Sequence, residues 1–254
     1  MTRLFSGTAI AFAGALAVAP IVALAQDLTD LSTEERSALH EEFRAYLLEN
    51  PEILLEAMQI LEDRQATAQA DADKLLLQQL TSEIQNDGRS WEGGNPDGDV
   101  VMVEFLDYRC GYCKRAHDDV AELISSDGNI RFIVKEFPIL GQGSLLASQF
   151  AIATRMEAGD DAYKAVHDAL MKLRQEPSEE ALRQIALDQG LDADAVLARM
   201  EDPEIVAELR ANRALAEQLS IQGTPSFIIG DEFVRGYVTL SAMREIVAEQ
   251  RDAS

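Results

Sequence analysis

The feature that most constrains the fold is a short apolar run that leads into the chain's only two cysteines. Residues 100–106 (VVMVEFL) follow turn-forming residues and carry apolar side chains at both alternating positions, as in a strand buried on both faces. Cys110 and Cys113 come next in Cys-x-x-Cys spacing, and residues 114–125 have helical periodicity. The sequence therefore predicts a central strand that delivers a cysteine pair to the start of a helix.

The spacing of the two cysteines favours redox chemistry over a structural cross-link. A disulfide that closes so short a loop removes little chain entropy from the unfolded state. Two neighbouring thiols can instead alternate between the dithiol and the disulfide, because one attacks a partner disulfide and the other resolves the mixed disulfide. At a helix start, Cys110 would meet unpaired N–H groups and the positive end of the dipole. Cys110 is therefore predicted to attack and Cys113 to resolve, with a structural disulfide as the alternative.

Glu104 is the second candidate residue, because it interrupts the apolar run of the predicted strand. Burying a carboxylate there would be costly, so its pKa should be raised. Such a group suits proton exchange with the resolving thiol. The alternative is that Glu104 lies at an exposed strand edge. Lys135, in a second predicted strand over residues 130–137, is its candidate charge partner if the two strands are adjacent.

The cysteines also raise two metal alternatives. His117 lies four residues after Cys113, which gives three conceivable zinc ligands. A structural zinc site needs four, and the other histidines, His40 and His167, are predicted to lie in unrelated helices. Two closely spaced soft thiolates also suit Cu(I). We expect no resident cofactor or metal beyond a redox-active disulfide of Cys110 and Cys113, with Cu(I) binding by this pair as the alternative.

The first 25 residues have the pattern of a secretory signal. Arg3 precedes an apolar run over residues 9–24, and Ala23-Leu24-Ala25 forms an A-x-A cleavage site. The run is shorter than the ~20 residues of a membrane-spanning helix. We expect cleavage after Ala25 and export to an oxidising compartment. The formal net charge of −23 argues against nucleic acid and anionic membranes as partners.

Residues 26–88 are predicted to form a helical arm. Ser32 and Glu35 fit a capping box, and Asn50-Pro51 marks the start of a second helix. Apolar residues recur along both helices with no obvious partner, and the arm is expected to associate with other copies of the chain; packing on its own domain is the alternative. This apolar stripe consists of Leu39, Phe43, Leu47, Leu54, Met58 and Leu61.

Residues 89–254 are predicted to form an α/β domain. Further strands are expected at residues 225–229 and 232–235, with Gly230-Asp231 at the turn. A helical insertion fills about residues 144–219, broken near Gly159, Pro177, Gly190 and Pro203, and Ser241 is expected to cap a final helix. Strand, Cys-x-x-Cys, helix and strand, followed by a helical block, a hairpin and a helix, is an α/β plan with a large insertion.

Three segments of this domain resemble the DsbA-like thioredoxin-fold oxidoreductases of the bacterial periplasm. They cover residues 94–114, 133–138 and 223–227, within a resemblance that extends from about residue 87 to the C-terminus. It implies a thioredoxin fold in which Cys110 is the nucleophile, Cys113 the resolving thiol and Glu104 the buried acid. Pro225 would be a cis-proline facing the disulfide, with Thr224 before it. The resemblance also implies exported cysteine-containing proteins as clients and a membrane redox partner of DsbD or DsbB type.

Residues 27–85 are similar to the N-terminal region of ScsC-type (suppressor of copper sensitivity) proteins, which use such helices to form oligomers. The dipeptide Gly111-Tyr112 departs from the Pro-His of DsbA oxidases and is similar to that of the isomerase DsbC, as is Thr224 before the proline. Without that histidine, we expect Cys110 to be less acidic than the DsbA value of about 3.5, and its disulfide to be less oxidising. A periplasmic disulfide isomerase or reductase is therefore implied, with a DsbA-type oxidase or a Cu(I)-binding copper-tolerance chaperone as alternatives.

Overall fold

A computed structural model describes residues 31–253, so the predicted signal over residues 1–25 lies outside the described part. The chain divides into two units between Leu61 and Glu62. The arm boundary near residue 88 stays a prediction. Among the described residues, no helix is long and apolar enough to cross a membrane.

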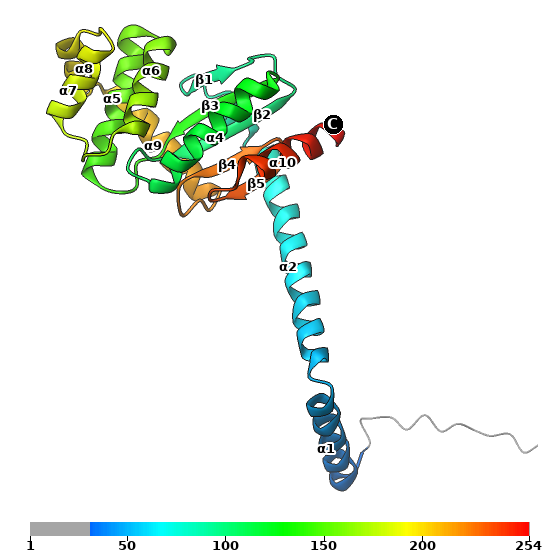
Figure 1. Ribbon diagram of the computed structural model, residues 1–254. Coiled ribbons are helices and arrows are strands. Elements are labelled where there is room, and N and C mark those ends of the chain that lie inside the picture. The colour runs from blue at the N-terminus through cyan, green and yellow to red at the C-terminus, as the bar shows by residue number, and fades with distance from the viewer. Residues whose placement is uncertain (1–30, 254) are drawn as a thin grey trace, which may run out of the picture. The chain divides into compact units, whose positions relative to one another are not determined.

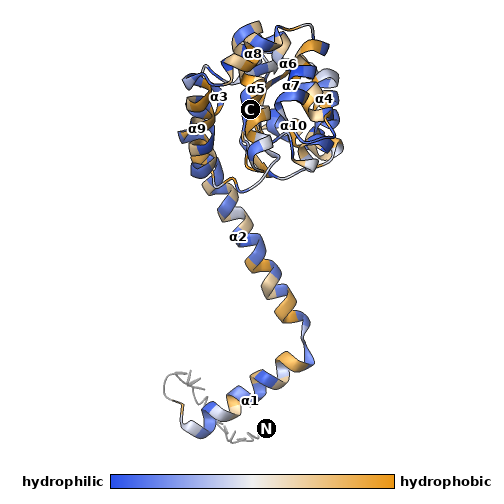
Figure 2. Ribbon diagram, turned by 90° about the vertical axis from the view of Figure 1, so that its left-hand side faces the viewer, coloured by the Kyte–Doolittle hydropathy of each residue, from blue (hydrophilic) through white to orange (hydrophobic). Residues whose placement is uncertain are grey.

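The first unit contains α1 (Thr33–Glu49) and the beginning of α2 (Glu52–Gln79). The predicted capping box is present: the Ser32 hydroxyl accepts from the Glu35 N–H, and the Glu35 carboxylate accepts from the Ser32 N–H at 2.9 Å. Asn50 ends α1 instead of capping α2, because its side-chain amide donates to the Tyr46 carbonyl at 2.9 Å. Figure 2 shows apolar residues scattered along both helices.

The second unit is built around a five-stranded sheet of order β1-β3-β2-β4-β5 (Figure 1). The predicted strands are β2 (Val100–Leu106), β3 (Ile130–Glu136), β4 (Ser226–Ile229) and β5 (Glu232–Arg235). β2 is parallel to β3 and antiparallel to β4, which places it at the centre. The sequence analysis missed β1 (Trp91–Gly94), which pairs antiparallel with β3, because its two glycines indicated a turn.

The two faces of the sheet pack against different helices. Alternate residues of β2, Val103 and Phe105, belong to a cluster with the end of α2, with α3 (Thr81–Gln85) and with the end of α9 (Pro203–Gln218). Met102 and Leu106, on the opposite face of the strand, belong to a larger cluster with α4 (Gly111–Asp127) and α10 (Leu240–Asp252). Both faces of the central strand are therefore buried, as its continuous apolar run predicts.

The helical insertion consists of α5 (Gln142–Ala158), α6 (Asp160–Lys172), α7 (Glu179–Asp188), α8 (Ala193–Arg199) and α9. The helices break at or close to the predicted glycines and prolines, and Figure 1 shows α5 to α8 gathered at one end of the sheet. The final helix starts two residues earlier than predicted. Its N-cap is Thr239, whose hydroxyl accepts from the Ala242 N–H at 3.4 Å, and Ser241 lies inside the helix.

Lys135 does not pair with Glu104, contrary to the candidate pairing from the sequence. In the β2–β3 register, Glu104 lies opposite Val134, so Lys135 projects to the other face of the sheet. There the buried Lys135 ammonium donates to Asp87 Oδ2 at 2.8 Å and to the Glu83 carbonyl at 2.9 Å. Burial alone would raise the pKa of Asp87, but hydrogen bonds from Lys135 and the backbone hold it well below its usual range. The segment that precedes β1 is thus fixed to the sheet.

Candidate active site

The cysteine pair lies where β2 leads into α4. Cys110 is the N-cap of α4, with extended backbone angles, and its sulfur accepts from the Cys113 N–H at 3.5 Å. A helix N-terminus has N–H groups without intrahelical partners, and here the thiol accepts one of them. Cys110 retains 8% of its surface exposed, whereas Cys113 is fully buried. Both residues are free thiols in the structure.

The two thiols differ strongly in acidity. The hydrogen bond from the Cys113 thiol is the main cause that lowers the pKa of Cys110 to about 5, and the backbone N–H groups of Cys113 and Tyr112 act in the same direction. Burial raises the pKa of Cys113 far above its usual range. At neutral pH the pair therefore consists of a Cys110 thiolate and a Cys113 thiol. The pKa of Cys110 lies above the ~3.5 of DsbA, in the direction expected for a motif without histidine.

The loop before β4 brings Thr224 and Pro225 to the cysteines from more than a hundred residues away. The peptide bond between them is cis, and the Thr224 carbonyl oxygen lies 3.0 Å from Cys110 Sγ. These residues also line a cavity of about 730 Å³ together with Gln69 of α2 and Arg235 of β5. Arg235 is held there by two hydrogen bonds to Asp73, at 2.7 and 2.9 Å. The cavity at this loop is therefore adjacent to the Cys110 sulfur.

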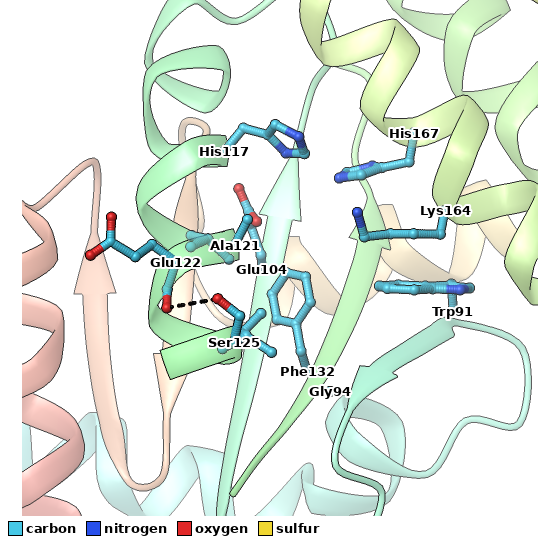
Figure 3. Close-up of a pocket in the computed structure, with 12 residues that line it drawn as sticks. Trp91, Gly94, Glu104, His117, Ala121, Glu122, Ser125, Phe132, Lys164 and His167 are labelled. Atoms are coloured by element: carbon cyan, nitrogen blue, oxygen red, sulfur yellow. Dashed lines mark hydrogen bonds between the residues drawn. The ribbon is translucent and has the colours of Figure 1, made fainter. Parts of the chain in front are cut away.

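Glu104 is buried, and its Oε1 has no hydrogen-bond partner among the described residues. Burial is the main cause that raises the pKa of Glu104 to about 8, and the charges of Cys110 and Glu136 raise it further. The Glu104 carboxyl points into a cavity of about 510 Å³ between α4 and α6 (Figure 3). The carboxyl lies on the same face of the sheet as Cys113. It is therefore a neutral acid at pH 7 that reaches a cavity, placed on the side of the resolving thiol.

Glu136 is a second buried carboxyl that the sequence analysis missed as a site residue. Its Oε1 accepts from the hydroxyls of Tyr108 and Tyr163, at 2.7 and 2.6 Å, and its Oε2 accepts from Ser148 at 2.7 Å. Burial raises the pKa of Glu136 to about 7, although the three hydroxyls oppose this. The same signal that singled out Glu104, an acid at the end of an apolar strand, could have found it.

The structure corrects the placement of the histidines. His117 and His167 were predicted to lie in unrelated helices, but their ring centroids are 5.2 Å apart, because α6 packs beside α4. His167 also lies 3.0 Å from the Tyr108 hydroxyl. This proximity depends on how the insertion docks on the sheet domain, which no local pattern in the sequence specifies.

The sheet domain matches a described protein family. Residues 101–248 match the DSBA-like thioredoxin domain, and residues 35–68 match the copper resistance protein ScsC N-terminal domain. The second match falls within α1 and the first part of α2. The two matches agree with the two resemblances seen in the sequence.

Solved structures with the same fold include several oxidoreductases. A thioredoxin-like oxidoreductase from Silicibacter pomeroyi is 39% identical, with a TM-score of 0.65 over 68% of this chain and 98% of that one. The thiol-disulfide exchange protein alpha-DsbA2 from Wolbachia pipientis is 32% identical, with a TM-score of 0.67 over 72% of this chain and 97% of that one. Proteus mirabilis ScsC in a transitional conformation is 28% identical, with a TM-score of 0.64 over 89% of this chain and 99% of that one.

Curated relatives are more distant. Disulfide bond formation protein D from Bacillus subtilis is 20% identical over 167 residues, which are 62% of this chain and 75% of that protein. The Na(+)/H(+) antiporter NhaA 3 from Salinispora tropica is 25% identical over 154 residues. The chain spans only 24% of the length of that antiporter.

Replacing Glu104 with glutamine should slow the resolution of mixed disulfides by Cys113. The amide keeps the shape of the side chain but cannot accept the Cys113 proton, so we expect a loss of roughly 10²-fold. In the unsubstituted protein this rate should rise with pH toward 8, as Glu104 ionises, and the variant should lack that rise. Rapid-mixing kinetics of a glutathione mixed disulfide on Cys110, between pH 5 and 8, measure both.

A matched control is Glu122→Gln, since Glu122 lines the same cavity but is exposed. It should leave the kinetics unchanged. The Glu104→Gln variant should remain folded, because it removes a group whose charge is costly to bury. If its resolution rate equals that of the unsubstituted protein across this pH range, Glu104 takes no part in the reaction.

Proposed function

Because the chain belongs to the family of DsbA-like thioredoxin domains, we propose that it is a thiol–disulfide oxidoreductase that isomerises or reduces disulfides of exported proteins. The observation that carries this proposal is the contrast between the two thiols. Cys110 is a thiolate that retains 8% of its surface exposed beside the Thr224–Pro225 loop, and Cys113 is a fully buried thiol. An attacking and a resolving sulfur need these two environments.

The reaction begins with the Cys110 thiolate, which attacks one sulfur of a client disulfide. A Cys110–client disulfide forms and the other client sulfur leaves as a thiolate. In isomerisation, a client thiolate then attacks the mixed disulfide, forms a new client disulfide and releases the Cys110 thiolate, with no net redox change. In reduction, Cys113 gives its proton to the ionised form of Glu104, which is the minority form at pH 7 and grows toward pH 8. The Cys113 sulfur then attacks Cys110 Sγ, and the second client sulfur leaves as a thiolate. The client leaves as a dithiol and the Cys110–Cys113 disulfide remains.

Thr224 and Pro225 are proposed to position the client main chain beside Cys110. Support comes from the 3.0 Å separation of the Thr224 carbonyl from Cys110 Sγ and from the cavity that Thr224 and Pro225 line.

After a reductive cycle the Cys110–Cys113 disulfide needs an electron donor, for which a membrane partner of DsbD type is the chemical match. The family's periplasmic relatives and the signal pattern over residues 1–25 support export to the periplasm, with cleavage after Ala25.

Isomerisation or reduction is favoured over oxidation by the motif and its electrostatics. With glycine and tyrosine between the cysteines, the pKa of Cys110 is about 5, so its thiolate is less stabilised than in DsbA. A less stabilised thiolate makes the disulfide a weaker oxidant.

A DsbA-type oxidase, served by a DsbB-type partner, is the second candidate. Cu(I) binding by Cys110 and Cys113 is the third candidate, favoured by the match to a copper resistance protein in the arm.

The redox state of the pair in the cell distinguishes these candidates. We expect acid quenching followed by thiol alkylation to recover the protein with Cys110 and Cys113 reduced. An oxidised pair would contradict isomerase or reductase function and indicate the oxidase. A reduced pair that binds Cu(I) stoichiometrically, but does not repair scrambled disulfides, would instead indicate the copper chaperone.

The helical arm is proposed to join several copies of the chain. Its apolar stripe is more than half exposed within one chain at Phe43, Met58 and Leu61, whose exposed fractions are 59%, 57% and 55%. Burial of this stripe between copies would contribute roughly 25 cal/mol for each Å² removed from water. Several active sites held together could retain a misfolded client while its disulfides rearrange.

Removing residues 26–61 should therefore give a monomer that still reduces disulfides but repairs scrambled ones poorly. The deletion stops at residue 61 because Leu77 and Ile84 are buried against the sheet, and their loss would damage the domain. Light scattering gives the oligomeric state, while insulin reduction and scrambled-ribonuclease repair give the two activities. If the full chain is monomeric at micromolar concentration, the proposed association is wrong. If the shortened chain repairs scrambled disulfides as well as the full chain, the association has no role in repair.

A further inference from the structure

A second cluster of reactive side chains lies apart from the cysteines, at the cavity between α4 and α6. His117 comes from α4, and His167 and Asp168 come from α6. One potential ligand atom from each of the three lies within 4.8 Å of the others. His117 Nε2 and Asp168 Oδ1 are only 3.0 Å apart. Figure 3 shows the two imidazole rings beside each other at the cavity that also receives the Glu104 carboxyl.

The hydrogen bonds behind His167 determine which of its nitrogens faces this cluster with a lone pair. The Tyr108 hydroxyl has one proton, which it donates to Glu136 Oε1 at 2.7 Å. Its oxygen lies 3.0 Å from His167 Nδ1, so it accepts a hydrogen bond from the Nδ1–H. His167 Nε2 is then unprotonated and can act as a ligand. A histidine whose other nitrogen donates to a fixed acceptor is the usual arrangement in metal sites.

We propose that His117, His167 and Asp168 form a binding site for a divalent transition-metal ion, with Zn²⁺ as the best match. Two imidazoles and one carboxylate are the protein ligands of open zinc sites, in which water completes the coordination. The Tyr108–Glu136 pair supplies the outer hydrogen bonds that orient His167. The site uses neither cysteine, so it differs from the zinc alternative that the sequence suggested for Cys113 and His117.

Two changes accompany binding of the ion. His117 Nε2 gives up its proton, which the metal replaces. Lys164, whose ammonium lies 2.5 Å from Asp168 Oδ2, turns away from the carboxylate. Lys164 has the room for this movement, because 46% of its side chain is exposed. Without a metal, Asp168 is held by His117 and Lys164, an arrangement that needs no ligand.

Zinc titration of the oxidised protein distinguishes a metal site from a side-chain cluster that binds no metal. With Cys110 and Cys113 joined in a disulfide, no thiolate is available to bind Zn²⁺, so the result does not depend on the proposed redox function. We expect calorimetry of the chain from residue 26 to show one saturable site. His117→Ala and Asp168→Asn should each weaken it by at least about tenfold. His40→Ala, a change at an exposed histidine of α1, should leave the affinity unchanged.

The buried His167 is tested through its hydrogen-bond partner. Tyr108→Phe keeps the ring but removes the acceptor of the Nδ1–H, and it should weaken zinc binding by roughly 10- to 100-fold. Circular dichroism verifies that this variant is folded. Visible absorption of the Co²⁺-substituted protein gives an independent readout, since bands of a four-coordinate site should vanish in His117→Ala. No saturable zinc binding, or equal affinity in His117→Ala and the unsubstituted protein, would overturn the proposal.

Discussion

The junction between the central strand and α4 is the constraint on which the rest of the site depends. It makes Cys110 the N-cap of the helix, with its sulfur against the Cys113 N–H, and it buries Cys113 one turn further in. Two chemically identical side chains thereby acquire opposite tendencies, because one is stabilised as a thiolate and the other is desolvated as a thiol. Glu104, on the strand that leads to the junction, is desolvated in the same interior. A nucleophile, a resolving thiol and a proton acceptor follow from one local arrangement.

The alternation of side chains along the sheet separates chemistry from structural support. On one face, Lys135 pairs with Asp87 and fixes the segment before β1. On the other face, Glu104 and Glu136 lie in the layer shared with α4 and the helical insertion. Each buried acid therefore meets a different environment. Glu136 is satisfied by three hydroxyls, whereas one oxygen of Glu104 has no hydrogen-bond partner among the described residues and reaches a cavity.

Much of this could be predicted from the sequence, because its signals are local. The central strand and the helix breaks follow from apolar runs and from glycine and proline positions, and the acid inside an apolar strand identified Glu104. The predictions that were wrong concern contacts between residues distant in sequence. The strand register, which places Lys135 away from Glu104, and the docking of α6, which brings His167 to His117, leave no local pattern. The strand over Trp91–Gly94 was missed because its glycines are held by pairing with β3.

The most direct test of this account is the acidity of Cys110 in the reduced protein. Thiolate absorbance near 240 nm, followed against pH, should show one transition with a midpoint at about 5, and Cys110→Ser should abolish it. Below that midpoint Cys110 takes up its proton, and attack on disulfides should slow in parallel. Cys113 should remain a thiol through neutral pH. A midpoint near the ordinary cysteine value of about 8.5 would contradict the account, because the helix start would then give no activation.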